Sequence, residues 1–165
     1  MGRQYNANHL GNSKHYQVQE TNWYEISIGG TSQDLTFMVQ SCTLPELSNP
    51  VIGVGYGNST AKVAGKREVG DSTFSFMDAM VADIESQILK WQDQVYDSKT
   101  GKMGWCTDYK RQVTVTQYGP DGSYERTWKF EGCWPSRVSY GSLSGESADK
   151  KVIQVTITYD DAKRE

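Results

Sequence analysis

Histidines, cysteines and closely spaced carboxylates are the residues of this sequence whose side chains could take part in catalysis or metal binding. The 165-residue chain has two histidines, His9 and His15, both in a polar N-terminal stretch where nothing would hold a base against a nucleophile. A Ser-His-Asp triad is therefore not expected. The three cysteines, Cys42, Cys106 and Cys133, include no CxxC pair and are odd in number, which argues against a metal site or a closed disulfide framework. We expect reduced thiols, with a disulfide between neighbouring chains as the alternative.

Other short motifs are equally unlike known catalytic or ligand-binding sites. The glycine-rich segment 53–57 lacks both the following helix and the Lys-Ser or Lys-Thr pair of a phosphate-binding loop. Asn58-Ser59-Thr60 matches a glycosylation acceptor, but a glycan would be added to it only in a secreted chain. Asp83 and Glu85 lie two residues apart and would point to different faces of a helix, while Asp160-Asp161 follows a strand and should be solvated. We predict no catalytic, cofactor-binding or metal-binding residues and no enzymatic activity.

Composition predicts a single soluble domain that does not bind nucleic acid tightly or insert into a membrane. Hydrophobic residues make up 36% of the chain, with five Trp, ten Tyr and four Phe, and the mean hydropathy is -0.66. The longest apolar runs are far shorter than the roughly 20 residues that span a bilayer, and the N-terminus has no stretch typical of a signal peptide. The net charge of -3 and the scattered basic residues argue against a phosphate-binding surface. We expect synthesis in the cytosol.

Alternating apolar residues predict a mainly β chain from Trp23 onward, after a polar arm at residues 1–22. Gly29-Gly30 is expected to turn the chain between strands at 24–28 and 35–39, forming a hairpin. The later strands are predicted from Phe74 and Phe76; Val113 and Val115; Trp128 and Phe130; and Ile153, Val155, Ile157 and Tyr159. Pro120-Asp121-Gly122-Ser123 predicts a tight turn between two of these strands.

One helix is predicted over about Met80 to Tyr96, with Asp78 as its N-cap. Apolar residues recur in it at three- and four-residue spacing: Val81, Ile84, Ile88, Trp91 and Val95. Burial of each of these side chains stabilises a fold by roughly 1.5 to 3 kcal/mol. The helix should therefore pack against the sheet.

Residues 43–68 carry apolar side chains without a long periodic pattern. Loops longer than about 12 to 15 residues are usually functional or disordered, yet disordered segments are poor in the aliphatic and aromatic residues found here. The residues in question are Leu44, Leu47, Val51, Ile52, Val54 and Tyr56. We expect this segment to dock on another subunit; the alternative is that it folds back on its own core.

A second unusual feature is the polar side of the predicted strands, which is almost uncharged. It consists of Thr73, Ser75, Gln112, Thr114, Thr116, Gln154, Thr156 and Thr158. Isolated sheets often use Lys and Glu to protect their edges. The scarcity of such charges here suits a hydrated wall that does not bind a ligand. Ordinary solvent-facing strands rich in Thr, a good β former, are the alternative.

Several stretches, taken in order, resemble the tail tube family of contractile-tailed phages and related injection systems. They are Trp23-Tyr24-Glu25-Ile26, Cys42-Thr43-Leu44-Pro45, Val63-Ala64-Gly65-Lys66-Arg67, Phe74-Ser75-Phe76-Met77-Asp78, Trp91-Gln92, Tyr118-Gly119-Pro120-Asp121-Gly122 and Trp128-Lys129-Phe130-Glu131-Gly132-Cys133-Trp134-Pro135. The resemblance covers roughly residues 22–160. Its most distinctive part is the aromatic strand that ends on Trp134-Pro135.

The resemblance implies two packed antiparallel sheets, a β-sandwich or barrel with one flanking helix, in a domain at 23–165. It further implies that six copies close into a ring with a continuous inner β-barrel, and that rings stack into a hollow conduit for DNA or cargo. The assembly residues that it implies, with those of the 43–68 segment, are Leu44, Pro45, Leu47, Val51, Ile52, Val54, Tyr56, Val63, Ala64, Gly65, Arg67, Trp134 and Pro135. Gln154, Thr156 and Thr158 are expected to face the lumen.

The same resemblance implies a place in the virion tail and a set of protein partners. These are further copies of the chain, the tail sheath, the baseplate initiator and the tape-measure protein, with no cofactor, no tight DNA binding and no membrane anchor. Alternatives within this class are the tube initiator of the baseplate, which often carries an added domain, and the tube of a non-phage injection system. The alternative from another class is a monomeric β-sandwich that binds glycans by stacking on Trp105, Trp128 or Trp134.

Overall fold

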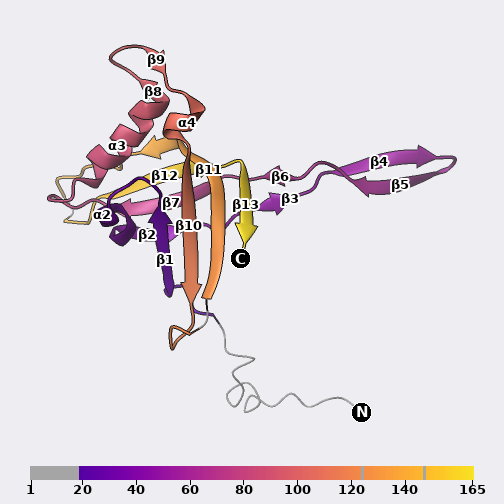
Figure 1. Cartoon of the computed structure of the whole chain (residues 1–165), viewed down its shortest axis with the longest axis horizontal. Helices are drawn as coiled ribbons and strands as arrows, with labels where there is room; N and C mark the ends of the chain where they lie inside the picture. Colours follow the sequence, from indigo (N-terminus) through magenta and orange to yellow (C-terminus); the bar gives the residue numbers. More distant parts are fainter. Residues whose placement is uncertain (1–18, 124, 147) are drawn as a thin grey trace.

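The protein folds around one antiparallel sheet of seven strands, seen in a computed structural model that describes residues 19–123, 125–146 and 148–165 (Figure 1). The strand order is β1-β10-β11-β12-β7-β2, and β13 pairs with β11 at a second place along that strand. The bounds are β1 Tyr24–Ile28, β2 Val39–Cys42, β7 Ser72–Met77, β10 Arg111–Tyr118, β11 Glu125–Ser139, β12 Val152–Thr158 and β13 Asp161–Arg164.

The long strand β11 belongs to both halves of this sheet. Its first part pairs with β10 and β13, and its second part pairs with β12. Gly132 lies where the two parts meet, with φ of 70°, and a Cβ there would lie 2.1 Å from Oδ2 of Asp160. Glycine is therefore required at this bend. The two predicted sheets are thus two halves of one sheet that share β11, and Figure 1 shows them running across each other.

The core lies between the two halves of the sheet. The ring of Phe130 on β11 meets Phe74 of β7 edge-on, with centroids 6.3 Å apart, and Tyr159 at 4.8 Å. Ile153, Val155 and Ile157 of β12 are each at most 1% exposed. The predicted strands around Phe74, Val113, Phe130 and Ile153 and the turn at 120–123 are confirmed; in the turn, the amide of Gly122 donates to the carbonyl of Gly119 at 3.0 Å.

The predicted helix exists but begins later than its apolar pattern indicates. Helix α3 spans Ile84–Val95 and buries Ile84, Ile88 and Trp91. Val81 is fully exposed, and the N-cap is Asp83, whose carboxylate accepts from the amide of Ser86 at 3.1 Å. Asp78, the predicted cap, instead pairs with Lys151 at 3.1 Å. Its backbone is also held by that neighbouring chain segment, since its amide donates to the carbonyl of Lys151.

The predicted hairpin at 24–39 is wrong. Strand β1 pairs with β10 rather than with a strand at 35–39. Residues Gln33–Phe37 form the short helix α2, which buries Leu35 and leaves Phe37 74% exposed. The chain enters the sheet again as β2, which pairs with β7.

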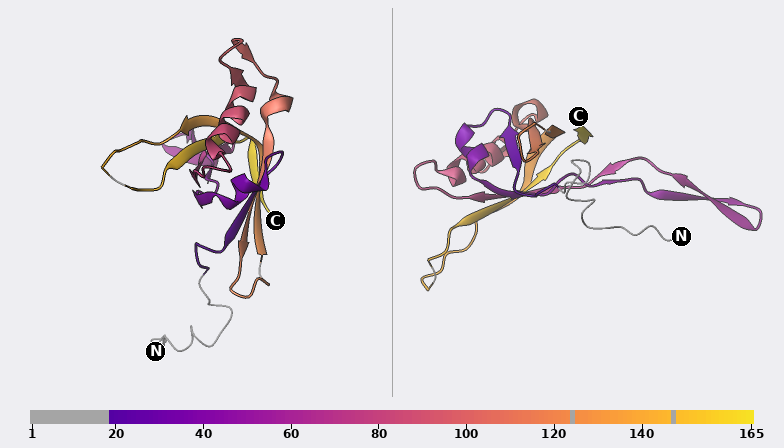
Figure 2. Two further views of the ribbon diagram at one scale, coloured as in Figure 1. Left: turned by 90° about the vertical axis from the view of Figure 1, so that its left-hand side faces the viewer. Right: turned by 90° about the horizontal axis from the view of Figure 1, so that it is seen from below.

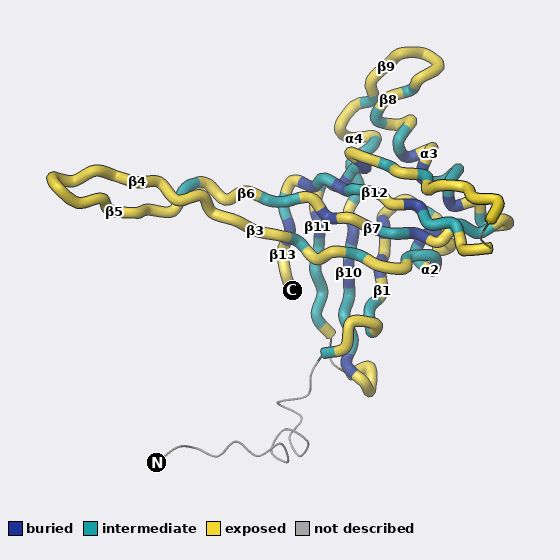
Figure 3. The backbone as a smooth tube through the Cα atoms, turned by 180° about the vertical axis from the view of Figure 1, so that it is seen from behind, coloured by how far each residue is buried: buried dark blue, intermediate teal, exposed yellow. Residues whose placement is uncertain are grey.

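Residues 47–69 form a second structure that projects from the body. Strands β3 Leu47–Ser48 and β6 Glu68–Val69 pair at its base, and β4 Val51–Tyr56 pairs with β5 Ser59–Ala64 beyond them. Figure 1 shows this hairpin extending along the longest axis of the molecule, and Figure 2 shows it clear of the body in a second direction. Every residue of β4 and β5 is exposed, as Figure 3 shows. The segment predicted to lack regular structure is therefore a β-ribbon.

The remaining elements lie beside α3. Strands β8 Tyr96–Asp97 and β9 Lys102–Met103 pair with each other, and helix α4 spans Cys106–Tyr109. The indole N–H of Trp91 donates to the carbonyl of Tyr109 at 2.8 Å, which ties α3 to α4. None of the helices in the described part of the chain is long and apolar enough to cross a membrane.

Candidate functional site: the projecting hairpin and its base

The hairpin formed by β4 and β5 turns at Gly57-Asn58. Tyr56 pairs with Ser59 across this two-residue loop, and Gly57 has φ of 61°. The hydroxyl of Ser59 donates to the carbonyl of Tyr56 at 3.1 Å. A two-residue loop whose first residue has positive φ favours glycine at that position. The turn fixes the register of the ribbon.

One face of the ribbon is apolar. Paired residues of an antiparallel ribbon share a face, so Ile52 lies beside Val63, and Val54 beside Ala61. Tyr56 continues this face towards the tip and is 82% exposed. The other face carries Val51, glycines, Ala64, Thr60 and Lys62. A two-stranded ribbon is only marginally stable alone in water. Burial of its exposed apolar face against another surface would therefore stabilise it.

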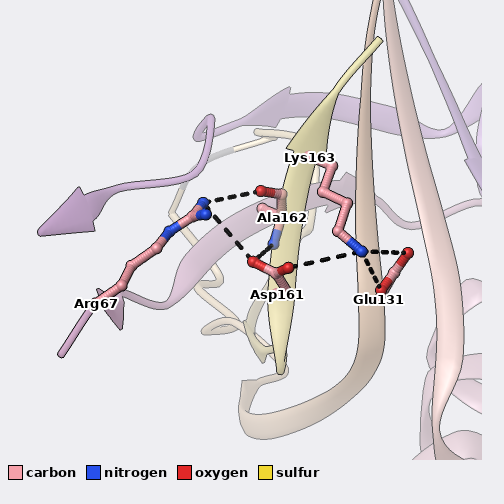
Figure 4. Close-up of polar contacts among 5 residues, drawn as sticks. All are labelled: Arg67, Glu131, Asp161, Ala162 and Lys163. Carbon is pink, nitrogen blue, oxygen red and sulfur yellow. Dashed lines mark hydrogen bonds and ion pairs between the residues drawn. The ribbon is translucent and has the colours of Figure 1, made fainter.

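The base of the hairpin is fastened to the C-terminal strand (Figure 4). Nη2 of Arg67 donates to the carbonyl of Ala162 on β13 at 3.1 Å and lies 3.7 Å from Oδ1 of Asp161. Lys163 in turn lies 3.7 Å from Asp161 and 3.1 Å from Glu131 on β11. These contacts join the hairpin to the sheet through a side chain immediately before β6.

Backbone hydrogen bonds add to this fastening. The amide of Gly70 donates to the carbonyl of Glu46 at 2.9 Å, and the amide of Thr43 donates to the carbonyl of Thr73 at 3.0 Å. Further out, Gly65 donates to the carbonyl of Pro50, and a Cβ on Gly65 would lie 2.9 Å from that oxygen. The base is therefore well connected, whereas the ribbon beyond it is not covered by the described part of the subunit.

Charge is also unevenly placed along the chain around the hairpin. Residues 47–67 include Lys62, Lys66 and Arg67 but no Asp or Glu, although the whole chain has a net charge of -3. The next stretch, residues 68–89, has five acidic residues and no Lys or Arg. The hairpin is thus a basic, apolar projection on an acidic protein.

The predicted assembly residues divide between this hairpin and the core. Leu44 and Leu47 at its entry are 41% and 39% exposed, and Pro45 is half-buried. Pro135, by contrast, is buried within the subunit. Trp134 is half-buried and meets the ring of Tyr109 at 6.0 Å. The hairpin residues are therefore available on the surface, and Pro135 is not.

The predicted polar face is split by the fold into two separate surfaces. Gln154 is exposed, and Thr156 and Thr158 are half-buried, while the alternate residues of β12 point into the core as predicted. Ser75 and Thr73 of β7 pair with Gln154 and Thr156, so they extend this surface. Gln112, Thr114 and Thr116 belong to β10, on the other half of the sheet. That half also carries ion pairs on β11 and β13, including Lys129 with Glu165 at 2.6 Å.

The described residues contain no group of three or more His, Cys, Asp or Glu placed to hold a metal ion. His9 and His15 lie outside the described residues. Burial raises the pKa of the Cys42 thiol to about 11 and that of Cys133 to about 12. Cys106 is exposed, 3.2 Å from the hydroxyl of Tyr109. Because burial disfavours the thiolate, Cys42 and Cys133 are poor nucleophiles near neutral pH.

The three tryptophans of the glycan-binding alternative differ in their exposure to solvent. Trp105 is 80% exposed. Trp128 packs partly against the core, and Trp134 packs against Tyr109. An extended stacking platform built from all three is therefore not formed in the subunit.

An antiparallel sheet that projects an uncovered apolar hairpin is typical of a structural protein that contacts other chains. Residues 20–163 match the family described as T4-like virus tail tube protein gp19, and the chain belongs to this family. Two relatives are the tail tube protein gp19 of Enterobacteria phage T4, 27% identical over 144 residues, and that of phage T6, 26% identical over 144 residues. Each alignment covers 84% of this chain and 87% of the relative.

Several solved structures share this fold. The tube-terminating cap of the anti-feeding prophage has a TM-score of 0.74 at 14% identity, with coverage of 90% of this chain and 91% of that chain. A chain of the sheath-tube complex of an extracellular contractile injection system in its extended state has a TM-score of 0.71 at 13% identity, with 98% of both chains covered. Hcp1 from Flavobacterium johnsoniae is more distant, with a TM-score of 0.52 at 9% identity over 86% and 94% of the two chains.

The protein is therefore a subunit of a contractile phage tail tube and has a structural role in the virion tail rather than an enzymatic one. Sequence analysis led to the same family. The hairpin, however, was recognised from its apolar content alone and not as a β-ribbon. The Gly57-Asn58 pair, a typical two-residue hairpin turn, is the signal in the sequence that could have revealed it.

Proposed function

We propose that six copies of the chain close into a ring and that rings stack head to tail into a hollow tube, through which DNA passes. The observation that carries this proposal is the projecting hairpin, whose apolar face is exposed and covered by nothing in the described part of the subunit. Contact between unlike surfaces of identical subunits gives closed rings or open filaments, depending on the rotation between copies. A stacked tube has both kinds of contact, with closed contacts within each ring and repeating contacts between rings.

The open edges of the sheet support ring closure. Strands β1 and β2 end the strand order, so their outer backbone groups have no partner strand among the described residues. Exposed edges pair readily with other chains, and closing a sheet into a barrel removes them. Pairing between copies would satisfy these groups in a ring.

The half of the sheet containing β7 and β12 is our choice for the lumen wall. Its outer surface has Gln154, Thr156, Thr158, Thr73 and Ser75, which are polar and uncharged, with Arg137 of β11 opposite Thr156. The outer surface around β10, β11 and β13 carries several ion pairs instead. A hydrated wall with few charges would let a polyanion slide without holding it.

The surface around β8, β9 and α4 is our choice for the sheath contact. Tyr96 and Met103 pair across β8 and β9, and they are 52% and 76% exposed. Trp105 follows at 80% exposed. Aromatic residues and methionine are enriched where proteins meet. A chain of the sheath-tube complex of an extracellular contractile injection system has this fold, which supports the sheath as a partner. The baseplate initiator and the tape-measure protein are further proposed partners.

Electron microscopy of the purified protein tests the proposal. Size-exclusion chromatography with light scattering should show particles of six subunits that grow with protein concentration, and negative-stain images should show hollow tubes. A protein that stays monomeric at every concentration, without rings in the images, would overturn the proposal. A structure of the tube with Ile153, Val155 and Ile157 facing the lumen would overturn the choice of wall.

A further inference from the structure

Most of the exposed large apolar residues of the described chain gather in three regions, while Leu89 on α3 and Leu143 between β11 and β12 lie outside them. One is the hairpin and its entry, and a second is the surface around β8, β9 and α4. The third lies at the opposite end of the molecule from the hairpin. We name this third region the end patch, and it consists of Phe37, Met77, Met80 and Val81.

The residues of the end patch lie on neighbouring segments of the chain. The amide of Met77 donates to the carbonyl of Met38 at 2.8 Å, so the end of β7 lies beside the end of α2, next to Phe37. Met80 and Val81 are fully exposed in the connection from β7 to α3. Figures 1 and 2 both place α2 and this connection at one end of the longest axis, with the hairpin at the other.

The residues of the end patch do not contribute to the core of the subunit. Phe37 is 74% exposed, and its burial partners would have to come from outside. The connection that carries Met80 and Val81 is nevertheless held in place. Lys151 pairs with both Asp78 and Glu85, and the amide of Asp83 donates to the carbonyl of Ala79 at 2.9 Å. The patch is thus presented on a fixed backbone.

Charge around the end patch is complementary to that of the hairpin. Asp34 on α2 and Asp83 at the start of α3 are exposed, whereas Asp78 and Glu85 are already paired with Lys151. The hairpin carries Lys62 and Lys66, both exposed, with no acidic residue between positions 47 and 67. Complementary charges fix the orientation of a contact and disfavour wrong pairings, hairpin on hairpin among them.

We propose that the hairpin of one copy docks on the end patch of a second copy in the next ring. The apolar face with Ile52, Val54 and Tyr56 covers the end patch, and the lysines of the hairpin approach the acidic residues around it. This inference rests on the proposed stacking of rings and names the acceptor surface for that stacking. The contact is between unlike surfaces at opposite ends of the molecule, so it can repeat from ring to ring without limit.

Mixed cysteine cross-linking tests the docking partner. Val54→Cys in one protein and Val81→Cys in another, each with Cys106→Ser, are mixed, allowed to form tubes and oxidised. Cross-linked dimers containing both proteins are expected in the tube fraction. Leu143→Cys, at a site 89% exposed on the connection between β11 and β12, is the matched control and should not cross-link to Val54→Cys.

A second measurement uses loss of apolar surface. Met80→Ser with Val81→Ser should raise the protein concentration needed for tube growth roughly tenfold, which corresponds to about 1.4 kcal/mol per contact, while Leu143→Ser leaves it unchanged. Because these side chains are fully exposed, the melting temperature should stay the same. Normal tube growth by the double variant, together with no cross-link between Val54→Cys and Val81→Cys in tubes of the cysteine variants, would overturn the inference and leave the proposed stacked tube unaffected. Wild-type protein that forms no tubes would overturn both.

Discussion

Trp91 joins three parts of the subunit through a single side chain. It is 2% exposed on α3, donates to the carbonyl of Tyr109 at 2.8 Å, and lies under the guanidinium of Arg111 at 4.9 Å from its ring centre. Trp91→Ala removes the ring, the hydrogen bond and the cation–π contact together. We expect the free energy of unfolding in urea to fall by about 3 to 5 kcal/mol.

The matched control is Trp105→Ala. Trp105 is 80% exposed, and surface substitutions usually change stability by no more than about 0.5 kcal/mol. If Trp105 contacts the sheath, this variant should lose sheath binding while its urea midpoint stays at the wild-type value. A Trp91→Ala protein with wild-type stability would contradict the packing described for α3.

The three cysteines should differ in reactivity in the folded subunit. Burial raises the pKa of Cys42 to about 11 and that of Cys133 to about 12, so at pH 8 their thiolate fractions are far below that of an ordinary thiol. Iodoacetamide at pH 8 should modify Cys106 first, as mass spectrometry of the digested protein can show. The rate at Cys42 should rise as the pH approaches 11, provided that the fold persists. Equal labelling of all three in native protein would contradict this assignment, and labelling in urea is the control.

At the scale of elements, Arg67 is the side chain that links the hairpin base to β13. Its pair with Asp161 is partly exposed and should stabilise the fold by no more than about 1 kcal/mol. Arg67→Gln should therefore leave the melting temperature nearly unchanged. Amide hydrogen exchange at Glu68 and Val69 should become faster, because the contact with Ala162 is lost, and tube growth should slow.

Lys129→Gln is the control for this prediction. Lys129 pairs with Glu165 at 2.6 Å on the same half of the sheet but does not contact the hairpin base. Its variant should keep the wild-type exchange rates at Glu68 and Val69. If both variants change exchange equally, the effect is a general loss of charge and not a loss of anchoring.

Removing the ribbon should separate folding from assembly. Replacing residues 51–64 by a short Gly-Ser linker deletes β4 and β5, all of whose residues are exposed, and leaves the β3–β6 base in place. Circular dichroism and melting should stay close to wild type, because no core residue is lost. Negative-stain microscopy should show no long tubes. A truncated protein that still forms long tubes, or one that unfolds, would show that the hairpin is not the contact between rings.

The strands of the core could be predicted because their burial alternates with the pleat. On β7 and β12, alternate side chains are buried, and the sequence shows the same two-residue period. The same period was misleading at Leu35 and Phe37, which lie in a five-residue helix where one is buried and the other exposed. A segment this short contains too few residues to distinguish a two-residue from a 3.6-residue period. The pairing of β1 with β10 is set by the whole sheet and not by the adjacent glycines.

The hairpin could not be predicted from periodicity, because neither of its faces is buried in the subunit. Glycines at 53 and 55 occupy the face opposite Ile52 and Val54, so the polar half of the expected alternation is missing. The helix start was misjudged for a related reason. Met80 and Val81 continue the apolar spacing of α3, yet they are exposed at the end patch. In both cases the apolar residues fit a contact between copies, which a single chain cannot reveal.

At the scale of the whole molecule, the two outer surfaces of the sheet differ in charge. The surface with Gln154 and Thr156 is polar and carries Arg137 of β11 opposite Thr156, whereas the surface of β11 and β13 carries Lys129, Lys163 and Glu131 in ion pairs. A tube wall that lets DNA pass should have few fixed positive charges, since each phosphate neutralised by Lys or Arg releases counterions and strengthens binding. The proposed assignment of β7 and β12 to the lumen rests on this difference.

The last prediction concerns DNA, and it applies to both the subunit and the tube. With a net charge of -3 and with its basic residues scattered along the sequence, the wild-type protein should bind duplex DNA more weakly than about 10⁻⁴ M at physiological salt. A mobility-shift assay on subunits and tubes checks this.

The variant Gln154→Lys with Thr156→Lys adds twelve positive charges per proposed ring of six to the expected lumen wall and should make DNA binding or passage measurably salt-dependent. The matched variant Thr114→Lys with Thr116→Lys adds the same charge to the β10 surface, and it should leave DNA retention inside the tube unchanged. Tight duplex binding by the wild-type protein would count against its role as a passive conduit, and equal retention by both lysine variants would count against β12 as the lumen strand.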